Sequence, residues 1–294
     1  MPGPPEAGER PLSCYLGGRG SGGVPALQAL QTAGRTAALT DSAKRRRDDA
    51  PAVSEDAAPL PVERGIAAAD WDVIGTALDT EGFAIMGGLL DAGACRAVAR
   101  LYPDDSRFRR HIHMAQHGYG RGEYKYFATP LPGVVAALRT ALYPALAPVA
   151  NRWNEALGDP VRFPPRLASF LTRCHDAGQT RPTPLLLKYG PGDYNCLHQD
   201  LYGEHVFPLQ AAILLSEPEQ DFTGGEFILT EQRPRMQSRA TVVPLRRGDA
   251  VIFAVRHRPA QGARRSYKVN LRHGVSMVLS GERFTLGIIF HNAK

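Results

Sequence analysis

Two residues near the middle of the chain have the types and the spacing of metal ligands. His198 and Asp200 stand two apart, after an apolar run that ends at Tyr189 and a Gly-Pro-Gly turn. Side chains two apart on a β-strand leave the same face, so we expect this imidazole and this carboxylate to converge. They supply two donors of a metal site, and the third must come from elsewhere.

The third ligand is sought among the later histidines, which are His205, His257, His273 and His291. His205 follows the first two ligands too closely to lie on an opposing strand, and His291 stands near the end of the chain. His257 has arginines and a proline as neighbours, which is typical of a solvated turn. His273 lies in a β-rich stretch, and we favour it over His257.

Two histidines and one carboxylate form the ligand set expected of a non-haem Fe(II) oxygenase. Such a set leaves coordination positions open for a bidentate 2-oxo acid and for dioxygen. The far carboxylate of that acid needs a cation, and the planar fork of an arginine suits it. Arg283 and Thr285 are alternate residues of a predicted strand, so the guanidinium and the hydroxyl can bind this carboxylate together.

The segments around these residues predict a mainly β fold with flanking helices. About eight short β-rich segments follow residue 184, separated by turn signals. This pattern is typical of a jelly-roll or cupin-like double-stranded β-helix. The expected strands cover residues 185–189, 196–200, 209–215, 226–230, 241–245, 250–253, 268–278 and 284–290.

Three regions are expected along the chain. Residues 1–64 are rich in Pro, Gly, Ala and charged residues, which predicts a disordered N-terminal tail. Residues 65–160 are expected to form a helical support region. Residues 161–294 are expected to hold the double-stranded β-helix core.

The support region contains recognisable helix signals. Asp70 and Asp91 have the positions of acidic caps that open helices, and residues 82–86 have the pattern of a short strand. Residues 134–157 have apolar residues at helical spacing. Pro144 and Pro148 predict a break in that helix.

Residues 107–132 combine three glycines with aromatic and basic side chains. This composition predicts a mobile loop. It could serve as a substrate lid or as a platform on which unpaired bases stack. The alternative is that its aromatic side chains pack on the core, and the sequence leaves both open.

The properties of the whole chain set limits on its class. A net charge of +6 over 294 residues permits a polyanionic partner such as nucleic acid without requiring one. The four cysteines are scattered and form no Cys-x-x-Cys pair, which indicates reduced thiols in a cytoplasmic protein. No apolar run of about 18 residues is present, so we expect no membrane span.

From residue 185 to residue 291 the chain resembles the iron(II)/2-oxoglutarate-dependent dioxygenase superfamily. The ordered set His-x-Asp, then His, then Arg-x-Thr carries the resemblance, together with the segments 224–227 and 248–253. Tyr189 stands nine residues before His198, which is similar to prolyl 4-hydroxylases, whose tyrosine at that place binds 2-oxoglutarate.

More narrowly, the chain resembles a bacterial group of oxygenases predicted to act on damaged nucleic acid. The matching segments are residues 122–127, 198–203 and 272–276. The resemblance covers most of residues 66–294 and leaves the tail unmatched.

The resemblance implies a dioxygenase that hydroxylates a substrate C–H bond and releases succinate and CO2. Its iron ligands are His198, Asp200 and His273, and dioxygen and 2-oxoglutarate are its cosubstrates. The implied 2-oxoglutarate contacts are Arg283, Thr285 and Tyr189.

Three classes of function follow from this reading. The first is oxidative demethylation of damaged or single-stranded nucleic acid, which the loop 107–132 and the group resemblance favour. The alternative is hydroxylation of a peptide, in the manner of a prolyl hydroxylase, or of a small metabolite. The third is a cupin-like binding protein without catalytic activity.

Overall fold

The computed structural model describes residues 60–201 and 203–294. Residues 1–59 of the expected tail lie outside the described residues, whereas its last residues belong to a helix, α1, at Pro61–Ala67. The other α-helices are α2 Trp71–Glu81, α3 Ala92–Ala99, α4 Gly133–Ala156 and α5 Leu167–Asp176. Two short 3₁₀ helices are η1 Asp105–Arg107 and η2 Met114–His117.

The strands before residue 185 are β1 Phe83–Met86, β2 Phe108–His113, β3 Gly120–Arg121 and β4 Glu123–Phe127. Those of the first half of the core are β5 Leu185–Tyr189, β6 Tyr194–His198, β7 Leu209–Leu214, β8 Phe222–Gly224 and β9 Phe227–Gln232. The remaining strands are β10 Arg239–Val243, β11 Ala250–Ala254, β12 His257–Gln261, β13 Ser266–Val275, β14 Val278–Gly281 and β15 Arg283–Ile288.

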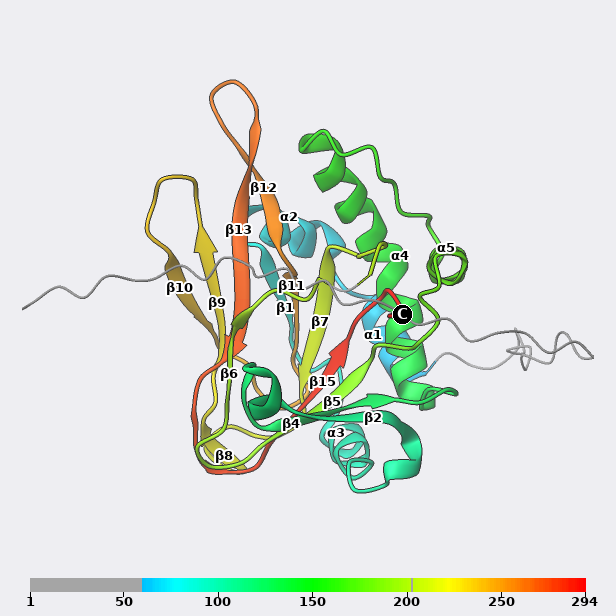
Figure 1. Cartoon of the computed structure of the whole chain (residues 1–294), viewed down its shortest axis with the longest axis vertical. Coiled ribbons are helices and arrows are strands. Elements are labelled where there is room, and N and C mark those ends of the chain that lie inside the picture. The colour runs from blue at the N-terminus through cyan, green and yellow to red at the C-terminus, as the bar shows by residue number, and fades with distance from the viewer. Residues whose placement is uncertain (1–59, 202) are drawn as a thin grey trace, which may run out of the picture. The chain divides into compact units, whose positions relative to one another are not determined.

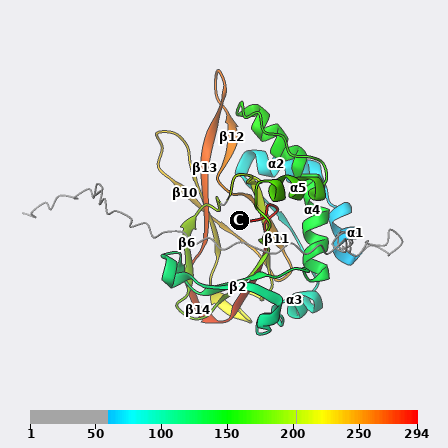
Figure 2. The same cartoon turned by 45° about the vertical axis from the view of Figure 1, so that its right-hand side comes forward.

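Two antiparallel sheets face each other and form the predicted jelly-roll core. The major sheet has seven strands in the order β1-β11-β7-β15-β5-β4-β2, and the minor sheet runs β10-β9-β13-β6-β3 with β12 beside β13. Figures 1 and 2 show the minor sheet on one side, the major sheet in the middle, and α1, α4 and α5 on the far side. The predicted fold class, a double-stranded β-helix with flanking helices, is confirmed.

Strand β7 shows why the middle layer is apolar on both faces. All six of its residues are buried, since helices cover one face and the minor sheet covers the other. Ile213 belongs to the cluster shared with the helices, while Ala212 packs with Phe227 and Phe253 between the sheets. Burial on both faces explains why this strand is apolar except for Gln210.

The helix starts predicted at Asp70 and Asp91 are confirmed. The Asp70 side chain accepts a hydrogen bond from the Val73 backbone N–H at 3.1 Å, and the Asp91 side chain accepts one from Ala94 at 2.8 Å. Both carboxylates therefore satisfy a backbone donor that the first helical turn leaves free.

The predicted break in α4 is wrong, because the helix runs unbroken from Gly133 to Ala156. Pro144 and Pro148 are four residues apart and both lie on the exposed side of the helix. The carbonyl groups that they deprive of a donor can therefore bind water. Buried residues on the opposite face, such as Leu142 and Leu146, hold the helix against the core.

The predicted loop at residues 107–132 is also wrong for most of its length. Residues 108–113 and 123–127 form β2 and β4, which extend the edge of the major sheet beyond β5. The region that we expected to be a helical support thus also contributes strands β1, β2 and β4 to the main sheet. A boundary between support and core at residue 160 stays a prediction.

Helix α4 is long and apolar enough to cross a membrane by length and composition, and among the described residues it is the one helix with this property. Of its most apolar window, 56% is buried inside the protein, as is usual for the core helix of a soluble fold.

The cysteines of the described region, Cys95, Cys174 and Cys196, are free thiols.

Arg139 anchors the C-terminal segment to α4. Its side chain is 4% exposed and donates hydrogen bonds to the carbonyl groups of Ile289, Phe290 and His291 and to the Asn292 side chain. Burial lowers the pKa of Arg139 to about 10, which leaves the guanidinium charged at neutral pH.

We expect Arg139→Met to lower the free energy of unfolding by about 3 kcal/mol, because several buried carbonyl groups lose their donor. Urea denaturation followed by circular dichroism measures this. Arg152→Met on the same helix is the control, since Arg152 is half-exposed and its ion pair with Asp79 contributes less than about 1 kcal/mol. Equal losses in the two variants would contradict this role of Arg139.

Candidate active site

The two predicted imidazole ligands lie opposite each other on neighbouring strands of the minor sheet. His198 is the last residue of β6, and His273 on β13 is its direct cross-strand partner. Their ring centroids are 4.2 Å apart. Gly274 next to His273 permits this approach, because a Cβ there would lie 2.6 Å from the backbone oxygen of Asn195.

Asp200 reaches the histidines from a loop and not from the strand that we expected. Strand β6 ends at His198, and residues 199 and 200 follow it without regular structure. The Gln199 side chain donates to the carbonyl oxygens of Arg256, at 3.0 Å, and Leu271, at 2.7 Å. These bonds hold the backbone between the two ligands in place.

The three donor groups have the separations of ligands that share one ion. His198 Nε2 lies 3.5 Å from Asp200 Oδ1, and His273 Nε2 lies 3.4 Å from Asp200 Oδ2. Adjacent donors bound at about 2.0–2.2 Å to a first-row metal ion lie roughly 3–3.5 Å apart. Ligand atoms of all three residues lie within 4.8 Å of one another, so the donor set fits Fe²⁺.

The protonation states of Asp200 and His273 suit metal binding, whereas the hydrogen bond to Asp200 outweighs burial and raises the pKa of His198. Burial acts to raise the pKa of Asp200, but hydrogen bonds from His198 and His273 hold it well below its usual range, so the carboxylate is ionised. Burial lowers the pKa of His273, which favours the neutral imidazole. The Nδ1 of His198 donates a hydrogen bond to the Cys196 carbonyl at 2.8 Å, so Nε2 is the ring nitrogen that would bind a metal ion.

Arg283, Thr285 and Tyr189 meet on the facing major sheet. Arg283 on β15 is the direct cross-strand partner of Tyr189 on β5, and its Nη1 donates to Thr285 Oγ1 at 2.6 Å. Its side chain is 1% exposed, and its Nε has no hydrogen-bond partner. Burial lowers the pKa of Arg283 to about 10, so it remains a cation at neutral pH.

A buried guanidinium that lacks a carboxylate partner among the described residues fits an anionic ligand. Gly225 makes room for it, because a Cβ at that residue would lie 2.9 Å from Arg283 Cδ, and its φ of 64° is one that glycine adopts without strain. The arrangement therefore fits the far carboxylate of a 2-oxo acid.

One cavity of about 280 Å³ between the sheets connects the triad to this cation. All six predicted site residues line it, from both sheets. Its remaining walls are mainly apolar or aromatic and include Leu187, Phe227 and Phe253. Phe253 packs against His273 with ring centroids 4.6 Å apart, which shields the imidazole from water.

Several residues of this cavity were not found from the sequence. Tyr124 and Tyr126 on β4 line it, whereas Phe127 on the same strand is fully buried in the core. Core packing, one alternative for the aromatic residues of this stretch, is thus found for Phe127, while a role of the tyrosines as a substrate lid or a platform for bases stays a prediction. Asn195 also lines the cavity and donates to the Tyr189 hydroxyl at 3.5 Å. Asn195 belongs to no sequence pattern that would have marked it, whereas Gln199 lies within the segment 198–203 that carries the family resemblance.

Comparison with known proteins identifies the family. Residues 122–293 match the model of a family described as an "oxygenase, catalysing oxidative methylation of damaged DNA". The chain belongs to this oxygenase family. Two uncharacterized proteins from strains CDC 1551 and H37Rv of Mycobacterium tuberculosis are each 52% identical to it over 200 residues, which is 68% of this chain and 84% of theirs.

The match confirms the predicted enzyme class at the level of an oxygenase. Solved structures with a similar chain path include a Pseudomonas putida prolyl-4-hydroxylase, at 17% identity and a TM-score of 0.44, covering 76% of this chain and 99% of that one. A Trichoplax adhaerens prolyl hydroxylase, at 14% identity and a TM-score of 0.45, covers 79% and 91%. The structure of OsALKBH1, at 15% identity and a TM-score of 0.40, covers 71% and 97%.

The choice of His273 over His257 as third ligand can be tested directly. We expect His273→Ala to weaken Fe²⁺ binding more than about 100-fold, because losing even an outer partner of a ligand costs about 10–100-fold. His257→Ala is the matched control, because His257 lies on β12 outside the cavity and should leave affinity unchanged. Anaerobic titration calorimetry measures both, and a loss confined to His257→Ala would overturn the assignment.

Proposed function

We propose that this oxygenase removes alkyl groups from bases of damaged nucleic acid by oxidation, using Fe²⁺, 2-oxoglutarate and dioxygen. His198, Asp200 and His273 would hold the iron, and Arg283 with Thr285 would hold the distal carboxylate of 2-oxoglutarate. The bound iron and cosubstrate supply the oxidation of a substrate C–H bond, with release of succinate and CO2. A hydroxylated N-methyl group leaves as formaldehyde, so the outcome is removal of the methyl group.

The protein's own residues orient the reactants and keep the site dry. The charge of Arg283 and the hydroxyl groups of Thr285 and Tyr189 fix one end of the cosubstrate deep in the cavity. The ionised Asp200 balances part of the charge of the metal. The rings of Phe227 and Phe253 limit the access of water to the centre.

The main observation that supports a nucleic acid substrate is a basic groove beside the cavity. This groove, of about 450 Å³, shares Tyr119, Tyr124 and Tyr126 with the wall of the catalytic cavity. Its basic residues are Arg109, Arg110, Arg181 and Lys294. None of its described lining residues is an aspartate or a glutamate, which favours binding of phosphates.

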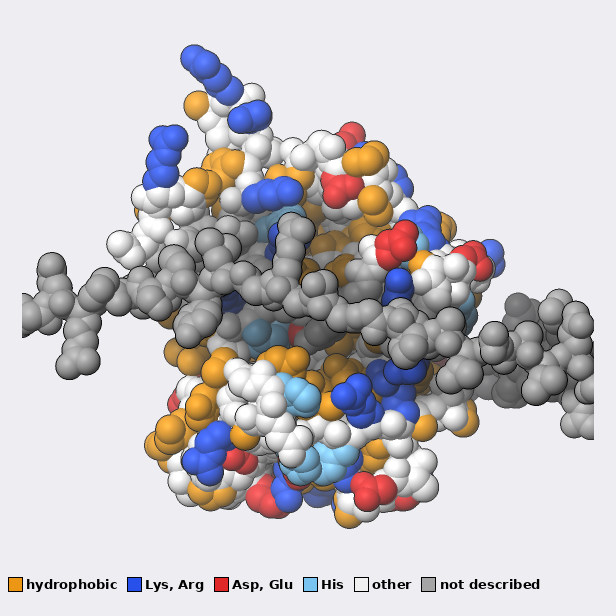
Figure 3. All heavy atoms as spheres, in the orientation of Figure 1, with side chains coloured by type: hydrophobic (Ala, Val, Ile, Leu, Met, Phe, Trp, Pro, Cys, Tyr) orange, Lys and Arg blue, Asp and Glu red, His pale blue; other side chains and the backbone are white. Residues whose placement is uncertain are grey.

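The positive charge of the groove is visible on the molecular surface. Lys and Arg side chains gather over β2 and beside the C-terminal residues (Figure 3). Arg109 lies with its guanidinium carbon 4.5 Å from the centre of the Tyr126 ring. Burial lowers the pKa of Arg109, and the neighbouring Arg181 and Arg110 lower it further. A bound phosphate would relieve the repulsion within this cluster.

The shared tyrosines supply stacking surfaces between the groove and the cavity. Tyr119 is 43% exposed and stacks on His117 with ring centroids 5.4 Å apart. An exposed aromatic side chain beside a cationic groove is typical of sites for unpaired bases. We propose that the nucleic acid backbone lies in the groove while one unpaired base enters the cavity past these rings.

The free thiols of the described region agree with a cytoplasmic location, which we also propose.

We expect Arg283→Gln to raise the KM for 2-oxoglutarate on the order of 100-fold, because losing a buried charge partner costs about 3 kcal/mol. Succinate formation in the absence of a nucleic acid substrate measures this. Arg272→Gln is the control, because Arg272 is exposed and neighbours the ligand His273 in sequence without lining the cavity. An unchanged KM in Arg283→Gln would remove this arginine from the cosubstrate site.

We expect the double change Arg110→Ala and Arg181→Ala to weaken binding of methylated single-stranded DNA. The slope of log affinity against log salt should fall by roughly 0.7 for each lost phosphate contact. Fluorescence anisotropy between low and moderate salt measures both, and the control is Arg100→Ala, which removes an exposed arginine directly after α3.

The substrate class is tested by formaldehyde release from alkylated single-stranded DNA and RNA. Formaldehyde formed in step with succinate supports demethylation. Absence of binding at low salt, together with absence of formaldehyde, would contradict it. Turnover of a peptide or small metabolite with affinity independent of salt would instead support the alternative, a hydroxylase of the kind that the Tyr189–His198 spacing resembles.

A further inference from the structure

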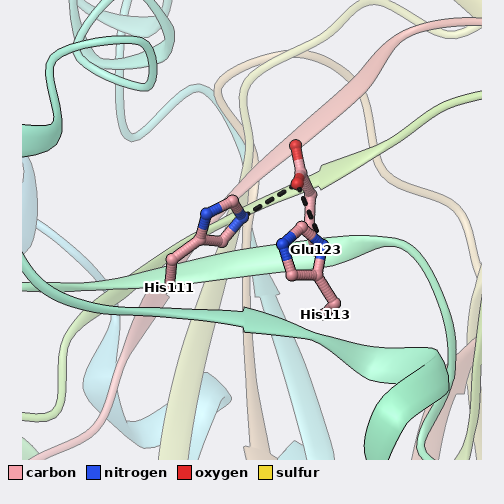
Figure 4. A group of neighbouring side chains, drawn as sticks. All are labelled: His111, His113 and Glu123. Carbon is pink, nitrogen blue, oxygen red and sulfur yellow. Dashed lines mark hydrogen bonds and ion pairs between the residues drawn. The ribbon is translucent and has the colours of Figure 1, made fainter.

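A second group of metal-binding side chains lies at the edge of the major sheet. His111 and His113 are alternate residues of β2, the edge strand, and Glu123 opens the neighbouring strand β4. His113 is the direct cross-strand partner of Glu123. Both imidazoles are turned toward the carboxylate (Figure 4).

The donor atoms have the separations that a first-row ion requires. His111 Nε2 lies 2.8 Å from Glu123 Oε2, and His113 Nδ1 lies 3.5 Å from the same oxygen. Ligand atoms of the three residues lie within 4.8 Å of one another. Two donors bound at about 2.0–2.1 Å to a tetrahedral Zn²⁺ ion lie roughly 3.3 Å apart, so small side-chain rotations suffice.

This group is separate from the catalytic cavity. Tyr124 and Tyr126 point their rings into the cavity, so the alternate residue Glu123 lies on the opposite face of β4. None of the three residues lines the cavity or the basic groove. The side chains of His111 and His113 are 36% and 53% exposed, which leaves them accessible to an ion from solution.

The surroundings favour a bound cation. The nearest lysines are already paired, Lys125 with Asp105 at 2.6 Å and Lys188 with Glu282 at 2.8 Å. Among the described residues, the ion pairs of Glu123 are therefore with the two imidazoles and with no lysine or arginine. Tyr102 contacts the His111 ring edge-on, with centroids 6.4 Å apart, and limits its rotation.

We propose that His111, His113 and Glu123 bind a divalent late first-row cation of the zinc class, with water in the remaining position. Imidazole and carboxylate donors suit such ions. Binding needs the tautomer of His111 that carries its proton on Nδ1 and the tautomer of His113 that carries it on Nε2. The ion joins β2 to β4, and so it holds the strand whose other face carries the tyrosines of the cavity.

Zinc titration of the untagged full-length chain tests the site. The catalytic centre is first removed with His198→Ala and Asp200→Ala, so that the remaining binding reports on the second group. We expect about one Zn²⁺ per chain by calorimetry, and a rise in melting temperature with Zn²⁺ since the ion binds the folded state.

Two further changes in this background decide the assignment. Glu123→Gln and His113→Ala should each weaken Zn²⁺ binding at least about 10-fold and abolish the thermal shift. His117→Ala is the matched control, because His117 is an exposed histidine four residues from His113 that belongs to neither donor group. Circular dichroism without metal checks that the variants fold. If His113→Ala does not fold, Glu123→Gln alone tests the site, because glutamine has nearly the same shape as glutamate. Equal Zn²⁺ affinity before and after Glu123→Gln, or a loss with His117→Ala, would overturn the proposal.

Discussion

The pairing register of β6 and β13 is the constraint on which the candidate centre depends. It sets His198 directly opposite His273. Because strand side chains alternate between faces, a slip of one residue would turn one imidazole away from the cavity. Strand β13 is held on its other side by β9, and Gly274 lets β6 approach closely. The pairing of the minor sheet therefore fixes the positions of the two imidazoles, and the loop after β6 adds the Asp200 carboxylate to them.

The facing sheet contributes a different kind of group, a buried cation. Burying Arg283 costs free energy, because its Nε has no partner and no carboxylate pairs with it among the described residues. Such a cost is typical of a binding site, since an anionic ligand supplies the missing charge. Two glycines make the space: Gly225 clears the Arg283 chain, and Gly122 clears the ring of Tyr189 by the same lack of a Cβ.

Strands β2 and β4 show how one edge of a sheet can serve two purposes. The inward face carries Tyr124 and Tyr126 to the cavity, and the outward face carries His113 and Glu123. Glycines and charged residues in this stretch predicted a loop, and that prediction was wrong because pairing with β5 supplies the stability that local propensity lacks. Unbroken α4 has a similar cause, since packing of its buried face outweighs two prolines on its exposed face.

The sequence by itself determined the chemistry that depends on residue type and short spacing. Arg-x-Thr could be recognised because a strand places alternate residues on one face, and His-x-Asp because its residue types and short spacing suit one metal ion, although Asp200 lies beyond the strand. The β5 segment and the caps at Asp70 and Asp91 follow from equally local patterns. Only the tertiary structure decided which groups from distant segments meet. Arg109 and Arg181 share a groove, and His111 meets Glu123, through sheet pairing and chain path, which no local pattern in one sequence encodes.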